Sequence, residues 1–133
     1  SLQEIGEWTF WDCNKVCISV IPEHVSKIGR LAFTCCEGIK ALVFKNQLEV
    51  INDRAFSGCK NLERIVFPNN LREISDFAFA RCINLKGINL PASLQKIGYR
   101  AFGNCESLLF VKYNSNPKVD SSAFMNCPIS QEK

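Results

Sequence analysis

The sequence predicts an α/β repeat solenoid, in which each repeat forms one coil and neighbouring coils supply one another's core. The first observation is a period of 23 residues, with isoleucine opening each copy at Ile5, Ile28, Ile51, Ile74 and Ile97. The second and third are a phenylalanine and a cysteine that recur at fixed offsets from these isoleucines. The columns are Phe10, Phe33, Phe56, Phe79, Phe102 and Phe124, and Cys13, Cys36, Cys59, Cys82, Cys105 and Cys127.

The repeats predict a single domain over residues 1–133, without an internal linker. One 23-residue repeat cannot bury its own apolar face, so stability must come from the stacking of neighbours. Residues 1–4 form a short lead-in. The repeats then cover residues 5–27, 28–50, 51–73, 74–96 and 97–118, and a truncated C-terminal repeat covers 119–133.

The first part of each repeat predicts a short helical segment. In the repeat at 51–73, apolar residues at Ile51, Ala55, Phe56 and Cys59 are three to four positions apart. This spacing is typical of one or two turns of α-helix or of a short 3-10 helix. Ala55 is small where the segment approaches its neighbour, and Phe56 is its largest inward side chain.

The next part of each repeat predicts a strand. Ile65 and Phe67 point inward and alternate with outward positions 64 and 66, which is the periodicity of a strand. Equivalent strands pair in parallel, because every coil runs the same way. Pro68 ends the strand, since it has no N–H to donate, and Leu71 and Ile74 close the coil along a second, shorter edge. The equivalent inward trios are Ile39/Leu42/Phe44, Leu85/Ile88/Leu90 and Leu108/Val111/Tyr113.

Charge and hydropathy exclude some classes of partner. The net charge is +3, and no run of lysine or arginine exceeds two residues, which argues against a nucleic-acid or anionic-membrane partner. No apolar stretch approaches the ~18–20 residues of a transmembrane helix. No signal peptide is visible in this chain.

The cysteine column predicts buried thiols. Equivalent residues of stacked coils lie about 4.8 Å apart, but their side chains point in parallel, which disfavours disulfides within the column. A straight column also cannot converge four ligands on a zinc ion. No metal or cofactor is therefore expected. Cys17 and Cys35 lie outside the column and are the candidates for reactive or paired thiols.

Catalytic residues are not predicted, and we do not expect an enzyme. His24, the one histidine, follows Pro22 on a loop and is expected at the surface. The GxSxG, P-loop, GxGxxG and HExxH motifs are absent from the sequence. Asp53 and Asp76 recur at one repeat position, where they could form a weak cation site. Capping of the predicted helical segments is the favoured interpretation.

The outward strand positions predict a partner-binding surface. If Ile65 and Phe67 point inward, positions 64 and 66 and their equivalents face solvent. Contiguous exposed apolar surface commonly marks an interaction site, although β-branched residues also serve simply as good strand formers. Phe110 is the sharpest candidate, since strand propensity does not require a phenylalanine there. The surface comprises apolar Ile18, Val20, Ala41, Val43, Val66 and Phe110, with polar Arg64, Asn89 and Lys112 at its far side.

The repeat pattern IxxxAFxxCxxLxxIxLPxxLxxI, clearest in Ile51–Ile74 and Ile74–Ile97, resembles that of the BspA-type leucine-rich repeat proteins. The resemblance covers nearly the whole chain and departs from the pattern at Thr9, Ser19, Lys45 and Pro117. It implies a right-handed leucine-rich-repeat coil with a parallel β-sheet on the concave face and short helical or 3-10 segments on the convex side. It also implies a secreted or cell-surface location (extracellular or periplasmic in a bacterium, or in a parasitic protist) and attachment to host cells, matrix proteins or other microbes. The family has no catalytic motif to carry over.

Two functions remain open. The first is a non-enzymatic binding module that holds a protein, such as a host surface or matrix protein, or an apolar ligand on the concave face. The second is a structural module whose apolar concave face, or open strand edge after 109–113, drives self-assembly. A weak homo-oligomer would be compatible with both. The mass in solution discriminates them, because self-assembly hides the surface that a foreign partner would need.

Overall fold

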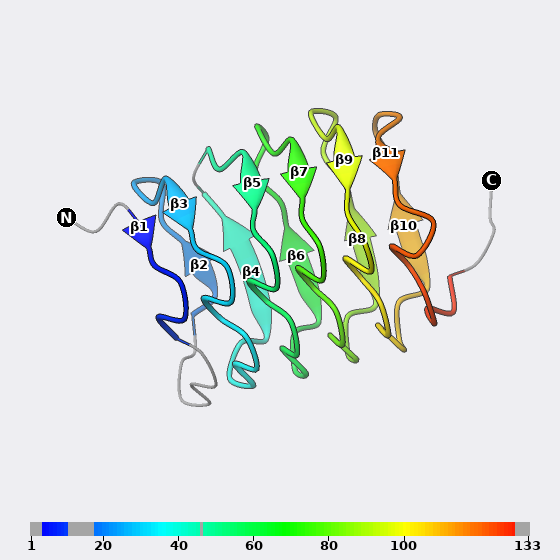
Figure 1. Ribbon diagram of the computed structural model, residues 1–133, viewed down its shortest axis with the longest axis horizontal. Coiled ribbons are helices and arrows are strands. Elements are labelled where there is room, and N and C mark those ends of the chain that lie inside the picture. The colour runs from blue at the N-terminus through cyan, green and yellow to red at the C-terminus, as the bar shows by residue number, and fades with distance from the viewer. Residues whose placement is uncertain (1–3, 11–17, 46, 130–133) are drawn as a thin grey trace.

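The computed structural model describes residues 4–10, 18–45 and 47–129. This part of the chain is a β-solenoid of stacked coils, in which all strand pairs are parallel (Figure 1). A repeat contributes one strand to a main sheet and a second strand, of two residues, to the other side of the coil (Figure 1). The predicted leucine-rich-repeat solenoid is thus observed, but its helical segments are not.

The main sheet contains the strands that the alternation of apolar residues predicts. β2 (Val20–Ile21), β4 (Ala41–Phe44) and β6 (Arg64–Val66) form one hydrogen-bonded group. β8 (Gly87–Asn89) and β10 (Phe110–Lys112) form another, which follows β6 along the solenoid (Figure 1). Partners in register are 23 residues apart, as in Leu42 with Ile65 and Val111 with Ile88. The repeat period therefore equals one coil.

A second set of short strands lies on the side of the coil opposite the main sheet. The sequence predicted a mixture of helix and extended chain there. β1 (Glu4–Ile5) pairs with β3 (Lys27–Ile28). β5 (Val50–Ile51), β7 (Glu73–Ile74), β9 (Lys96–Ile97) and β11 (Lys118–Val119) form a four-stranded ladder. The isoleucine that opens each repeat is the buried residue of its strand. Between β3 and β5 the ladder is interrupted, and there Asn52 Nδ2 donates to the Ile28 carbonyl oxygen at 2.6 Å.

The predicted helical segments are wrong, because the structure has no helix in the described residues. In the four repeats that cover residues 28–118, two residues each have left-handed backbone angles, as at Arg54 (φ 56°) and Gly58 (φ 74°), and an α-helix cannot contain them. Positive φ at the third position is what a type II turn requires. Each segment is therefore a series of tight turns. The equivalent pairs are Leu31 and Cys35, Phe77 and Arg81, and Arg100 and Asn104.

Hydrogen bonding between coils explains why turns replace the helix. The Ala55 N–H donates within its own turn to Asn52 O at 3.1 Å, whereas the next N–H, of Phe56, donates to Ala78 O of the following coil at 2.8 Å. This alternation continues along the segment. A helix would use these N–H groups internally, and the coils would then lose the ladder that joins them.

The core is built from the predicted columns. The phenylalanine rings stack along the solenoid with centroids 5.0–5.4 Å apart, from Phe10 through Phe124. Phe44 at the end of β4 and Phe67 directly after β6 meet the stack edge-on at Phe56 and Phe79. Both arrangements are favourable for aromatic rings. Because each ring fills the space between its neighbours, one residue per repeat forms a continuous apolar axis.

The cysteine column is buried beside this stack at Cys36, Cys59, Cys82 and Cys105. Each thiol points to the carbonyl oxygen of a phenylalanine one coil earlier. Cys59 Sγ donates to Phe33 O, and Cys82 Sγ to Phe56 O, both at 3.3 Å. Burial raises the pKa of each of these two thiols above the ordinary thiol value of 9.0. Cys13 and Cys17 lie outside the described residues.

These thiols are expected to resist alkylation in the folded protein. At pH 8, iodoacetamide should modify the half-buried Cys35 before Cys59 and Cys82, because the thiolate is the nucleophile and burial suppresses it. Mass spectrometry of tryptic peptides measures this order, and denatured protein is the control in which all three react. Equal labelling in the folded state would contradict the buried column.

The same pKa shifts predict a pH dependence of stability. A thiol whose pKa is raised by folding makes a contribution to the stability of the folded state. This contribution is fully present at pH values below the pKa of the unfolded thiol, which is about 9. This contribution is then lost as the pH rises further, because the unfolded thiol ionises first. Denaturation midpoints should therefore fall as the pH rises above about 9.

Candidate binding surface

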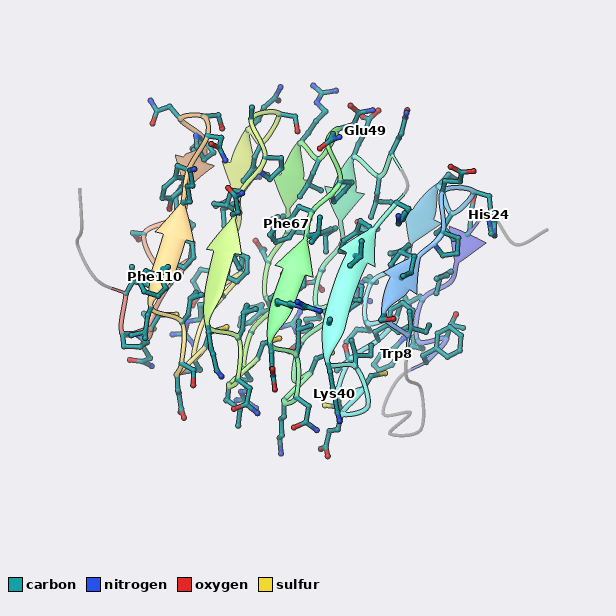
Figure 2. The ribbon with its side chains drawn as sticks, turned by 180° about the vertical axis from the view of Figure 1, so that it is seen from behind. Trp8, His24, Lys40, Glu49, Phe67 and Phe110 are labelled. Carbon is teal, nitrogen blue, oxygen red and sulfur yellow. The ribbon has the colours of Figure 1, made fainter. Side chains whose placement is uncertain are left out.

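The outward residues of β2, β4, β6, β8 and β10 form what we call the main-sheet face. Arg64 and Val66 are exposed on β6, whereas Ile65 between them is buried, which confirms the predicted alternation. Figure 2 looks onto this face and labels Phe110 on β10. The main-sheet face comprises Val20, Ala41, Val43, Arg64, Val66, Gly87, Asn89, Phe110 and Lys112.

A row of valines crosses the first three strands of the main-sheet face. Val20, Val43 and Val66 are in register on β2, β4 and β6. Val20 is 45% and Val66 54% exposed, and Val43 between them is half-buried. Neighbouring strands lie about 4.8 Å apart, so the three side chains form one continuous apolar strip.

Phe110 is the most exposed large apolar side chain of the face, with 64% of its surface accessible. It lies in register with Gly87 of β8. A Cβ atom placed on Gly87 would lie 3.6 Å from the Cβ of Phe110, an ordinary contact distance. Since glycine leaves this space open, one flank of the Phe110 side chain is free of a neighbouring side chain from β8.

The polar side of the face contains Arg64, Asn89 and Lys112, all exposed. Asn89 is oriented by Asn114, whose Nδ2 donates to Asn89 Oδ1 at 2.7 Å. Lys112 is in register with Asn89 on the neighbouring strand. The arrangement therefore places two valines and a phenylalanine in solvent next to charged and amide groups.

Two predicted orientations are wrong. Ile18 packs partly buried against the core, while Ser19, in an inward column, is exposed. The serine cannot form the apolar contacts that an inward position normally provides, and the adjacent Ile18 forms them instead. Tyr113, predicted inward, is 44% exposed. In the described part of the chain, β10 pairs only with β8, so its outer side lacks the cover that inner strands receive.

The remaining candidates that the structure describes do not assemble a chemical site. His24 is exposed near one end of the solenoid (Figure 2). Asp53 forms ion pairs with Arg30 at 3.4 Å and Arg54 at 3.0 Å. Asp76 Oδ1 accepts a hydrogen bond from the Tyr99 backbone N–H at 2.8 Å. Throughout the described ranges, no group of three or more His, Cys, Asp or Glu residues has the geometry of a metal site.

Sequence reasoning missed the turn segments as a source of surface chemistry. Arg54 and Arg100 occupy the same repeat position, and Arg81 lies at the second left-handed position of its own repeat. The spacing of these arginines was visible in the sequence. Their proximity was not, because residues from three different repeats come together only when the coils stack.

The described segments include no helix that is long and apolar enough to span a membrane.

Comparison with known proteins gives a family and several related structures. A family model described as "BspA type Leucine rich repeat region" matches residues 1–131 with six copies. Among curated proteins, none matches the chain. A leucine-rich repeat protein from Bacteroides ovatus is 35% identical, with a TM-score of 0.77 over 84% of this chain and 29% of that chain.

Two further solved structures of leucine-rich repeat proteins are similar to this chain. A leucine-rich cell surface protein from Faecalibacterium prausnitzii is 30% identical, with a TM-score of 0.79 over 86% of this chain and 30% of that chain. The leucine-rich repeat protein of T. pallidum is 30% identical, with a TM-score of 0.75 over 84% of this chain and 55% of that chain. The present chain thus spans about a third to about half of the length of these relatives.

Proposed function

Since the chain belongs to the BspA-type leucine-rich repeat family, we propose that it is a non-enzymatic binding module whose main-sheet face holds a protein partner. The observation that carries this proposal is the exposure of Val20, Val66 and Phe110 on one face. Monomeric soluble proteins rarely leave contiguous apolar patches in solvent, and larger ones mark interaction sites. Solenoids also commonly bind partners on their extended sheet surfaces.

The composition of the face supports a protein partner. Interfaces between proteins combine an apolar centre with a polar rim. The valine strip supplies such a centre, and Arg64, Asn89 and Lys112 supply polar groups beside it. Phenylalanine is also among the residues enriched in interfaces, which makes Phe110 a suitable anchor.

The partner class we propose is a host surface or matrix protein, met outside a bacterial cell. The Faecalibacterium relative is described as a cell surface protein, which supports this location. The relatives are longer than this chain, so the proposal concerns the binding module and not the activity of a whole protein.

The proposal predicts that changes on the face weaken binding strongly without unfolding the protein. Phe110→Ala and Val43→Glu should each weaken binding to a panel of immobilised extracellular-matrix proteins at least tenfold, as expected for interface hot spots of about 2 kcal/mol. Met125→Ala is the matched control, because Met125 is an exposed apolar residue of a turn segment. Biolayer interferometry measures binding, and thermal unfolding confirms the fold. Unchanged binding by both face variants would remove the proposal.

A second candidate function is self-assembly, which a specific observation favours. Leu109, Phe110 and Tyr113 are all exposed around β10, and in the described residues the outer side of this strand is unpaired. Exposed edges of this kind pair readily with another chain. Light scattering across a concentration series, with and without reductant, discriminates the two functions. A stable oligomer that Phe110→Ala dissociates supports assembly, whereas a monomer at all concentrations supports a foreign partner.

A further inference from the structure

A pocket of about 250 Å³ lies between the turn segments of three successive repeats. It is lined by Arg54, Arg81 and Arg100, together with Phe77 and Asn104 and other small or polar residues. Among the residues that the structure describes, no carboxylate lines it. The pocket is built by turn segments, whereas the main-sheet face is built by strands, so the two surfaces share no residue.

The left-handed turns bring these arginines together. Arg54 and Arg100 occupy the same turn position two repeats apart, with φ values of 56° and 49°. Phe77 holds that position in the repeat between them, with φ 58°. Arg81, at φ 62°, belongs to the next left-handed position of the middle repeat. The stacking of coils therefore brings three arginines from three successive repeats to one pocket.

Aromatic rings hold two of the guanidinium groups in place. Arg54 Cζ lies 4.3 Å from the centroid of the Phe77 ring, and Arg100 Cζ lies 5.2 Å from that of Tyr99. The two rings meet edge-on at 5.4 Å. Cation–π contacts of this length are attractive. They restrict the motion of the arginine side chains, so less conformational entropy remains to be lost when a ligand binds.

The charge in the pocket is only partly compensated. Arg54 forms an ion pair with Asp53 at 3.0 Å. Neither Arg81 nor Arg100 has a carboxylate within ion-pair distance among the described residues. In addition, Arg100 Nε is buried and has no hydrogen-bond acceptor among the described residues. Buried donors in proteins are normally paired, so the described protein leaves this guanidinium without its full set of acceptors.

We propose that this pocket binds a tetrahedral oxyanion, a sulfate or phosphate group, through Arg81 and Arg100. Arginine donates paired N–H groups whose geometry matches such oxygens. Asn104 adds a donor, because its Oδ1 already accepts from Asn126 Nδ2 at 2.8 Å and its own Nδ2 is left for a ligand. The volume is below the ~300–1,000 Å³ of pockets for drug-sized ligands. It therefore fits a charged group, either a free ion or an ester on a larger molecule.

Calorimetric titration with defined anions tests the proposal. Probes are inorganic sulfate, inorganic phosphate, and a sulfated heparin tetrasaccharide with its desulfated counterpart, all at low ionic strength. Binding of the sulfated but not the desulfated saccharide is expected, and added NaCl should weaken it. Affinity of free sulfate equal to that of the saccharide identifies the ion alone as the ligand, and tighter saccharide binding identifies an ester. Absence of binding by all sulfated and phosphate probes would overturn the proposal.

Matched arginine variants locate the site. Arg81→Gln combined with Arg100→Gln should weaken anion binding at least tenfold, and Arg81→Gln alone should weaken it by a smaller factor without altering the thermal midpoint. Arg72→Gln is the control, because Arg72 pairs with Glu49 at 3.7 Å and does not line the pocket. Equal loss in the control would show general charge attraction and contradict the pocket, as would wild-type binding by the folded double variant.

Discussion

Leu42→Glu is expected to abolish cooperative folding, whereas Val43→Glu, one residue further along β4, should leave the fold intact. Leu42 is fully buried between coils, and Val43 faces outward on the main-sheet face. Transfer of a carboxylate into the apolar core without a partner costs several kcal/mol. We expect a loss of more than about 4 kcal/mol in the free energy of unfolding at Leu42, a large part of the stability of a small domain.

Urea denaturation followed by circular dichroism measures both variants at pH 7. The matched pair isolates the direction of the side chain, because the introduced residue, the strand and the sequence neighbourhood are the same. At pH 4, protonation should relieve part of the loss at Leu42, since a neutral carboxyl group is cheaper to bury. Equal destabilisation of the two variants would contradict the alternation on which the main-sheet face rests.

Phe79→Ala is expected to lower the free energy of unfolding by about 4 kcal/mol, within the range for phenylalanine truncated in a core. The ring is fully buried between Phe56 and Phe102, with centroids 5.4 and 5.3 Å away. Phe67 also meets it edge-on at 5.9 Å. Its removal interrupts the aromatic stack in the middle of the solenoid, where coils on both sides depend on it.

Phe110→Ala is the control for this variant, because the same side chain is removed from a mostly exposed position. Surface substitutions of this kind usually change stability by less than about 0.5 kcal/mol. Phe124→Ala should fall between the two, since Phe124 is half-buried and stacks on one described ring, Phe102. Equal losses of unfolding free energy in Phe79→Ala and Phe124→Ala would contradict the view that a ring in the stack is stabilised by neighbouring rings on both sides.

The binding face illustrates how much of a site periodicity can predict. Alternation along 64–67 is enough to assign Val66 outward and Ile65 inward, and equivalent positions in other repeats follow by the period. The assignment fails at Ile18 and Tyr113, both near an end of the main sheet. A residue there is not packed between two equivalent neighbours, so its orientation depends on local packing and not on the repeat.

The turn segments show why a correct apolar pattern still predicted the wrong element. Ala55, Phe56 and Cys59 are all buried, as a helical face requires. The same residues are also buried by two successive tight turns, and spacing alone does not distinguish the two backbones. Gly58 and its equivalents Asn104 and Asn126 favour left-handed angles, but Arg54, Phe77 and Leu31 adopt them without any such local preference.

The sequence by itself determined the period, the apolar columns and the direction of the residues of the inner strands, because these follow from which side chains avoid water at regular intervals. Only the tertiary structure decided that the segments after each opening isoleucine are turns, since their N–H groups bond alternately within the turn and to the next coil. It likewise decided that Arg54, Arg81 and Arg100 share one pocket. The physical reason is that the turn segments form hydrogen bonds between coils with residues 21–22 positions away. No local sequence pattern shows which of the two backbones those distant residues will stabilise.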